Sequence, residues 1–238
     1  MKLIFGVLVK CISVLAIMLA TQKVYGVKGE EIMGKEKLIY VMDPQCGWCY
    51  GNAENIKELE SRLDGKYELQ LMLGGMWLGN NAPRGGEGLN QFIKQHSPRM
   101  ESVTGAYVSE KFYELTSDSS YVFSSLEPSA AILAVMKIAP EKTLEFTGKV
   151  QKAMFADGLR LDQEVVYLNI LQELSIDEGE FRELWLSEGN IENLNEMFQH
   201  SGSMVSGFPT LIKYSNGVYT DVASGYFDLK KIVRILGL

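Results

Sequence analysis

Apolar and polar positions in the first third of the chain predict a strand, a helix and a second strand. Residues 38–42 form a continuous apolar run with β-branched and aromatic members, which is typical of a central strand covered on both faces. Residues 67–73 mostly alternate between apolar and polar side chains and predict another strand. Between them, apolar residues recur at helical spacing up to a turn near Asp64 and Gly65: Ala53, Ile56, Leu59 and Leu63. This order predicts a right-handed parallel crossover.

A long helical region separates this unit from a second β region. Across residues 87–202 the apolar positions recur at helical spacing, and we expect Asn190 to cap one of the helices. Strand character returns in residues 210–214 and 218–222, which an Asn-Gly turn separates as in a β-hairpin. A final helix is expected to begin after Asp228.

These patterns divide the 238 residues into five segments. No internal repeat or low-complexity tract interrupts them. We expect a signal peptide in residues 1–26, a linker in 27–36, the first part of one α/β fold in 37–86, a helical insertion in 87–202 and the second part of the fold in 203–238.

The first 26 residues have the features of a targeting segment. Lys2 and Lys10 precede the apolar run 11–20, and residues 24–26 offer a cleavage site at suitable spacing. Export is therefore predicted. The alternative is an uncleaved membrane anchor in residues 3–20, although the uninterrupted run has only about half of the roughly 20 residues that cross a bilayer.

Charge and cysteine content narrow the chemistry. The formal net charge is −7, and removal of the signal peptide takes away three lysines and no acid, so nucleic acid is a poor partner. Because Cys11 lies in the signal peptide, the mature chain keeps only Cys46 and Cys49 and has one possible intramolecular disulfide. No metal site is expected, since structural zinc needs four ligands and both histidines are isolated in the sequence.

Cys46 and Cys49 lie where the first predicted strand meets the following helix. Their spacing puts the sulfurs one helical turn apart, with Cys46 at the helix amino terminus, where backbone N–H groups and the helix dipole stabilise a thiolate. Cys46 is therefore the expected nucleophile. Cys49 is expected to be more buried and to attack a mixed disulfide formed by Cys46. An inert structural pair is the alternative.

A second local signal, Gly207-Phe208-Pro209-Thr210, directly precedes the predicted hairpin. Proline is tolerated at the first position of a strand, and a cis Phe208-Pro209 bond would expose the Phe208 backbone for pairing with an extended peptide. Trp48, Phe208 and Pro209 are the expected substrate-binding residues. Met76 and Trp77 are weaker candidates, because each is as compatible with the core.

Together these residues resemble the DsbA-like branch of the thioredoxin superfamily, and within it bacterial protein-disulfide isomerases. The resemblance implies an α/β thioredoxin fold interrupted by a large helical insertion. It implies that Cys46 is the attacking thiol, that Cys49 is the resolving thiol, and that Pro209 is a cis-proline facing them. It also implies that Gly47, Trp48 and Pro209 tune the redox potential. From Leu38 to the end it rests on Asp43-Pro44, Cys46, Trp48-Cys49-Tyr50-Gly51, Gly74-Gly75, Thr104-Gly105 and Gly207-Phe208-Pro209-Thr210.

The chain departs from this family in three respects. Many relatives place a buried carboxylate six residues before the first cysteine to move protons for the resolving thiol. Tyr40 stands there in this chain, so water or another group must take that part. Strongly oxidising members often have histidine between the cysteines, where this chain has Gly47 and Trp48. Dimeric isomerases usually carry an additional amino-terminal domain, which this sequence lacks, so a monomer is expected.

The sequence therefore predicts an exported enzyme, in the bacterial periplasm, that exchanges disulfides with cysteine-containing client proteins. It needs a redox recycling partner, which the sequence does not identify, and no cofactor. One alternative is a peptide-binding chaperone with secondary redox activity, favoured by the helical region. Another is a glutathione-dependent transferase or isomerase of the kappa-class and chromene-carboxylate group, which usually has serine where this chain has Cys46.

Overall fold

Residues 36–238 are described by the computed structural model. The expected signal peptide, the alternative membrane anchor and most of the expected linker therefore lie outside the described residues. Within residues 36–238, no helix is both long enough and apolar enough to span a membrane.

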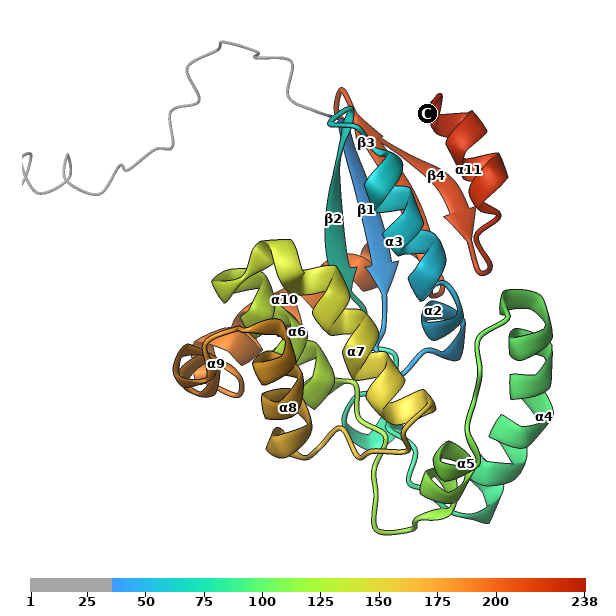
Figure 1. The fold of residues 1–238 in the computed structure, drawn as a ribbon, viewed down its shortest axis with the longest axis vertical. Helices are drawn as coiled ribbons and strands as arrows, with labels where there is room; N and C mark the ends of the chain where they lie inside the picture. Colours follow the sequence, from blue (N-terminus) through green and yellow to red (C-terminus); the bar gives the residue numbers. More distant parts are fainter. Residues whose placement is uncertain (1–35) are drawn as a thin grey trace, which may run out of the picture. The chain divides into compact units, whose positions relative to one another are not determined.

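Four strands form a mixed sheet in the order β2-β1-β3-β4 (Figure 1). β1 (Glu36–Met42) pairs in parallel with β2 (Tyr67–Leu73) and antiparallel with β3 (Thr210–Ser215). β3 forms a hairpin with β4 (Val218–Ser224), and the two turn residues have positive φ values of 52° and 80°, as a tight hairpin turn requires. The sequence-based strand predictions are confirmed.

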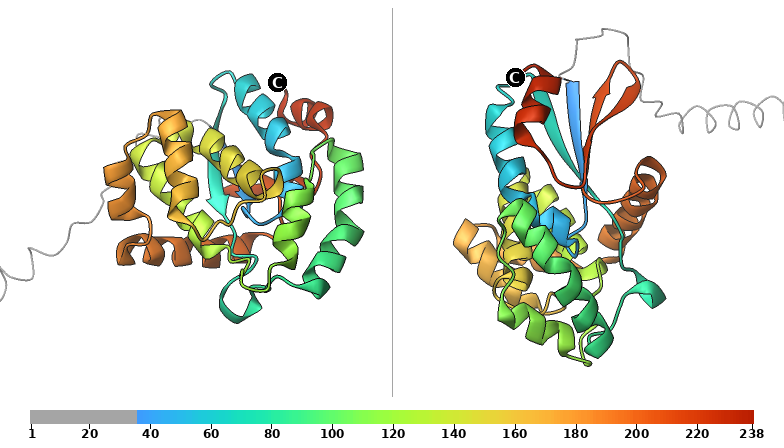
Figure 2. Two further views of the ribbon diagram at one scale, coloured as in Figure 1. Left: turned by 60° about the horizontal axis from the view of Figure 1, so that its bottom comes forward. Right: turned by 90° about the vertical axis from the view of Figure 1, so that its right-hand side faces the viewer.

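β1 is buried on both faces, which explains its continuous apolar run. One set of its side chains, including Tyr40, joins the main core with α3 (Ala53–Arg62) and α11 (Leu229–Leu236). The alternate set, including Val41, contacts the end of α10 (Glu188–Met204). Figure 2 shows α3 and α11 on one face of the sheet and α10 on the other.

Seven helices follow β2 and precede β3, and they gather at the carboxyl end of β1 (Figure 1). Residues 128–135 of α6 are all buried, which is typical of a helix surrounded by other helices. This arrangement confirms the expected thioredoxin fold with a helical insertion. Besides α10 and the short turns η1 (Gly79–Asn81) and η2 (Pro140–Lys142), the elements are α4 (Glu87–Thr104), α5 (Glu110–Ser117), α6 (Leu126–Ile138), α7 (Thr143–Phe155), α8 (Glu164–Leu174) and α9 (Glu178–Leu184).

The predicted cap at Asn190 is wrong. The N-cap of α10 is Ser187, whose hydroxyl accepts a hydrogen bond from the Asn190 backbone N–H. The Asn190 side chain is buried and donates instead to the carbonyl oxygens of Ala130, at 3.0 Å, and Trp185, at 2.9 Å. Its amide therefore ties α10 to α6, a tertiary contact that the local sequence pattern does not contain.

Candidate active site

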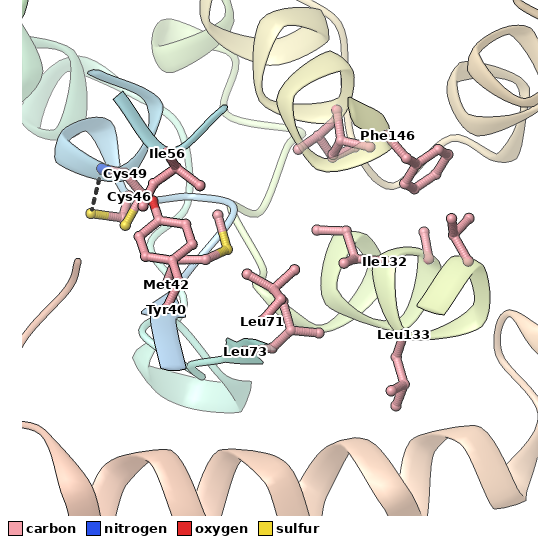
Figure 3. Close-up of a cluster of buried hydrophobic side chains, with 14 of the residues drawn as sticks. Tyr40, Met42, Cys46, Cys49, Ile56, Leu71, Leu73, Ile132, Leu133 and Phe146 are labelled. Atoms are coloured by element: carbon pink, nitrogen blue, oxygen red, sulfur yellow. Dashed lines mark hydrogen bonds between the residues drawn. The ribbon is translucent and has the colours of Figure 1, made fainter. Parts of the chain in front are cut away.

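The two cysteines lie at the junction of β1 and α2 (Gly47–Gly51), as predicted. Cys46 is the N-cap residue of α2, and its Sγ accepts a hydrogen bond of 3.3 Å from the Cys49 backbone N–H (Figure 3). A helix amino terminus carries unpaired N–H groups and a partial positive charge. Negative charge on the Cys46 sulfur is therefore stabilised.

The two thiols differ in burial and in the cost of ionisation. Cys46 is 6% exposed, whereas Cys49 is 0% exposed, so only the first of the two residues has any contact with solvent. Burial raises the pKa of the Cys49 thiol well above its usual value, and the hydrogen bond to Cys46 and the charge of Cys46 raise it further. Cys49 therefore keeps its proton more firmly than an exposed thiol does.

The fold brings the Phe208-Pro209 segment to the cysteines from a point 162 residues further along the chain. The Phe208-Pro209 bond is cis, and the Cys46 thiol donates a hydrogen bond of 3.6 Å to the Phe208 carbonyl oxygen. The Phe208 ring lies against Gly74, where a Cβ atom would come within 2.1 Å of the ring. The absence of a side chain at Gly74 therefore lets Phe208 approach the end of β2.

The predicted substrate-binding residues differ in exposure. Trp48 and Phe208 are partly exposed, while Pro209 is buried beneath the loop. Trp77, a weaker candidate, packs edge-on against Phe123 with ring centroids 6.4 Å apart. Trp77 therefore contributes to packing between the segment after β2 and the helical insertion. Gly47 and Trp48 lie between the two cysteines in the sequence, in the first turn of α2.

Asp43 is a site residue whose function the sequence reasoning did not assign. It is fully buried, and its carboxylate accepts hydrogen bonds from the Gln45 N–H at 2.8 Å, the Met76 N–H at 2.8 Å and the Ser125 hydroxyl at 3.0 Å. Burial raises its pKa to about 6, although these hydrogen bonds act in the opposite direction. Asp43 thus joins the cysteine loop, the segment after β2 and the start of α6. The sequence signal that could have indicated this site residue is an aspartate directly after a buried strand and before Pro44.

Tyr40, which replaces the carboxylate of many relatives, is 3% exposed on β1. Its hydroxyl points toward the two cysteine side chains (Figure 3). Burial raises the pKa of Tyr40 well above its usual value, and the nearby cysteines raise it further. The side chain is therefore a neutral hydroxyl beside the sulfurs. Within residues 36–238 no cluster of acidic, histidine and cysteine side chains could hold a metal ion.

No family model and no curated protein matches the sequence, but solved structures are similar to this fold. A candidate protein disulfide isomerase from Nitrosomonas europaea is 22% identical, with a TM-score of 0.76 over 85% of this chain and 96% of that chain. The cytosolic disulfide reductase DsbM from Pseudomonas aeruginosa is 25% identical, with a TM-score of 0.72 over 84% of this chain and 97% of that chain. The thiol-disulfide exchange protein alpha-DsbA2 from Wolbachia pipientis is 19% identical, with a TM-score of 0.51 over 88% and 83%.

These relatives share the interrupted fold across nearly all of the described residues, and this chain keeps two paired thiols at the junction of β1 and α2. The chain therefore has the DsbA-like form of the thioredoxin fold that these solved disulfide oxidoreductases have, with a pair of thiols at the junction of β1 and α2.

Proposed function

We propose that this enzyme exchanges disulfides with cysteine-containing client proteins, with Cys46 as the attacking thiol and Cys49 as the resolving thiol. The observation that carries the proposal is the asymmetry of the pair. Cys46 caps α2 and is partly accessible beside the Phe208 carbonyl, whereas Cys49 is closed off from solvent. Only Cys46 can meet an incoming client sulfur.

The reaction proceeds through a mixed disulfide. The Cys46 thiolate attacks one sulfur of a client disulfide, a Cys46–client bond forms, and the other client sulfur leaves with the electron pair and takes a proton from solvent. Cys49 then loses its proton and attacks the Cys46 sulfur, which releases the second client thiolate. Two electrons pass from the cysteine pair to the client, and the reverse sequence oxidises a client dithiol.

Client binding uses the surface around Phe208. A pocket of about 430 Å³ adjoins this residue and is lined in part by Leu78, Phe198 and Val205. Trp48, on α2 between the two cysteines, is also partly exposed. The Phe208 backbone directly precedes β3 and offers its carbonyl to an extended client segment, in the manner of strand addition.

The clients are exported proteins, the enzyme acts as a monomer in the periplasm, and a separate protein or small thiol recycles the cysteine pair. Residues 1–26 support export. The opposing hypothesis is that the cysteine pair acts as a reductant. It is motivated by the similar structure from Pseudomonas, which is described as a cytosolic disulfide reductase. The reduction potential distinguishes them: about −120 mV indicates a donor of disulfides and about −270 mV a reductant.

Replacement of Cys46 tests the proposal against a chaperone function. In Cys46→Ser, exchange with a disulfide-containing peptide is expected to fall to the uncatalysed rate, because a hydroxyl cannot form the mixed disulfide. The same variant is assayed for suppression of aggregation of a cysteine-free client. Full exchange activity in Cys46→Ser would overturn the proposal, and strong suppression of aggregation would favour the chaperone.

A further inference from the structure

A second cavity lies beside the cysteine-bearing helix and shares no lining residue with the pocket next to Phe208. This cavity, the Tyr40 cleft, has a volume of about 760 Å³ and lies between α2 and α3, the segment after α4, and α7. Its exposed outer part carries the carboxylates of Glu54, Glu60, Glu141 and Glu145. The client-binding surface does not account for this cleft.

Three buried polar side chains line the inner end of the Tyr40 cleft: Tyr40 at 3%, Thr147 at 4% and Gln151 at 2% exposure. The Gln151 Nε2 donor has no hydrogen-bond partner in the described part of the chain. The Thr147 hydroxyl donates to the Thr143 carbonyl at 2.8 Å and keeps its own oxygen as an acceptor. Buried polar groups are normally hydrogen-bonded. We therefore expect a small molecule in the cleft to accept a hydrogen bond from the Gln151 Nε2 group.

Water fits this inner end. One water occupies roughly 30 Å³ and needs two to four polar partners. The cleft is large enough for it, and the Gln151 amide and the hydroxyls of Tyr40 and Thr147 supply the partners. An acceptor for the Cys49 proton is also needed, because this thiol is completely buried and must ionise before it attacks. Tyr40 is the residue that both lines the cleft and directs its hydroxyl at the cysteines (Figure 3).

We propose that Tyr40 relays the proton of Cys49 to water held in the Tyr40 cleft by Thr147 and Gln151. This inference rests on the proposed disulfide exchange. The Cys49 thiol gives its proton to the Tyr40 oxygen as the Tyr40 hydroxyl passes its own proton to the water and onward to solvent. The Cys49 thiolate then forms the bond to the Cys46 sulfur, the Cys46–client bond breaks, and the client sulfur leaves with the electron pair.

Tyr40 returns to its starting state and acts as a relay rather than as a base. Besides Tyr40, the phenols of Tyr50 and Tyr107 line the cleft. Asp43 lies on the cysteine side, the four glutamates listed above line the outer cleft, and Lys57 is exposed among them. Lys149 and Lys152, on α7, are each paired with a carboxylate, Glu173 and Asp157 respectively.

The test resolves the two chemical steps. Reduced protein is mixed with an equimolar amount of 5,5′-dithiobis(2-nitrobenzoate) in a stopped-flow instrument. One coloured thiolate leaves when Cys46 attacks, and a second leaves when Cys49 resolves the mixed disulfide. In Tyr40→Phe we expect an unchanged first phase and a second phase that is slower by about a hundredfold at neutral pH, the lower end of the range for positioned proton transfer. This deficit shrinks in alkaline buffer, where hydroxide takes the proton.

Two further variants test whether a slower second phase in Tyr40→Phe comes from a disturbed fold rather than from the lost hydroxyl. Gln151→Met removes the unpaired amide from a different helix and is expected to slow the second phase alone, by a smaller factor. Tyr67→Phe is the matched control, because this buried tyrosine donates to the Leu236 carbonyl at 3.1 Å and pairs with the opposite end of β1 from the cysteines. Both phases are expected to remain at wild-type rates in Tyr67→Phe.

An unchanged second phase in Tyr40→Phe would overturn the relay, as would equal slowing of both phases or a deficit that does not depend on pH. Selective slowing in Asp43→Asn with none in Tyr40→Phe would assign the proton to Asp43 instead. If the wild-type protein releases no second thiolate, the proposed exchange function itself fails. Normal wild-type release with a normal Tyr40→Phe contradicts only the relay.

Discussion

The surroundings of Cys46 and of Cys49 differ sharply although the two residues are one helical turn apart. Cys46 lies at the amino terminus of α2, next to the Phe208 carbonyl. The Phe208 side chain is partly exposed. Cys49 lies inside the core, near the hydroxyl of Tyr40, which lines the Tyr40 cleft. The difference indicates a division of labour in which one side meets the client and the other side handles the proton.

The largest effect is expected at Asp43, where the two environments meet. Burial raises its pKa from 3.8 to about 6. An acid with a higher pKa in the folded state binds protons more tightly when folded. The contribution of Asp43 to the unfolding free energy is therefore largest at low pH, and it falls as the pH rises from the pKa of the unfolded state to that of the folded state. We expect this single group to lower the unfolding free energy by roughly 3 kcal/mol across that window.

Asp43→Asn isolates this contribution, because every other titrating group is retained. Urea unfolding of the wild type and the variant in a pH series is the measurement, and the difference between the two curves is expected to change through this window. Asn also loses one acceptor for the Met76 N–H, which adds a constant penalty at every pH. Parallel curves would contradict the buried, high-pKa carboxyl.

The next effect concerns the client side alone. In Gly74→Ala the new Cβ would lie 2.1 Å from the Phe208 ring, so the ring must move away from the end of β2. We expect a loss of about 2 kcal/mol of unfolding free energy from overpacking and slower exchange with peptide substrates. Gly207→Ala is the matched control, since nothing lies within 4 Å of its Cβ position. Equal behaviour of the two variants would argue against close packing of Phe208 on β2.

Truncation of Phe208 separates client binding from the chemistry of the two sulfurs. Phe208→Ala keeps both sulfurs and the Tyr40 cleft but removes apolar contact area from the client surface. We expect KM for a disulfide peptide to rise roughly tenfold, equivalent to about 1.4 kcal/mol of binding energy. Reaction with a small aromatic disulfide is expected to change by less than about twofold. A matching loss with both substrates would place Phe208 in the chemistry rather than in client binding.

The smallest effect is expected at the exposed ion pair of Lys149, a residue that lines the Tyr40 cleft. Lys149 and Glu173 form an ion pair of 2.8 Å, but the Glu173 side chain is 61% exposed. Exposed pairs contribute little because water and salt screen them, so Glu173→Ala should change the unfolding free energy by less than about 0.5 kcal/mol. Both phases of the stopped-flow reaction should remain unchanged. A slower second phase would extend the proton path to this ion pair.

Local sequence predicted the strands, the hairpin, the position of Cys46 at a helix start and the order of the fold. Each depends on periodicity or on turn chemistry within a few residues. The buried polar contacts could not be predicted in this way. The hydrogen bond from Ser125 to Asp43 joins residues that are 82 positions apart in the sequence. The Tyr40 cleft likewise brings together Tyr40 of β1 with Thr147 and Gln151 of α7. Asn190 was misassigned for the same reason, because its buried amide binds another helix.

Trapping of the mixed disulfide shows which of the two sulfurs attacks the client. Cys49→Ser and Cys46→Ser are each incubated with a peptide that contains one disulfide, and adducts are identified by intact-protein mass before and after reduction. We expect Cys49→Ser to accumulate a stable peptide adduct on Cys46, and Cys46→Ser to accumulate none because Cys49 is buried. An adduct on Cys49 in Cys46→Ser, or none in Cys49→Ser, would contradict the assignment of the two sulfurs.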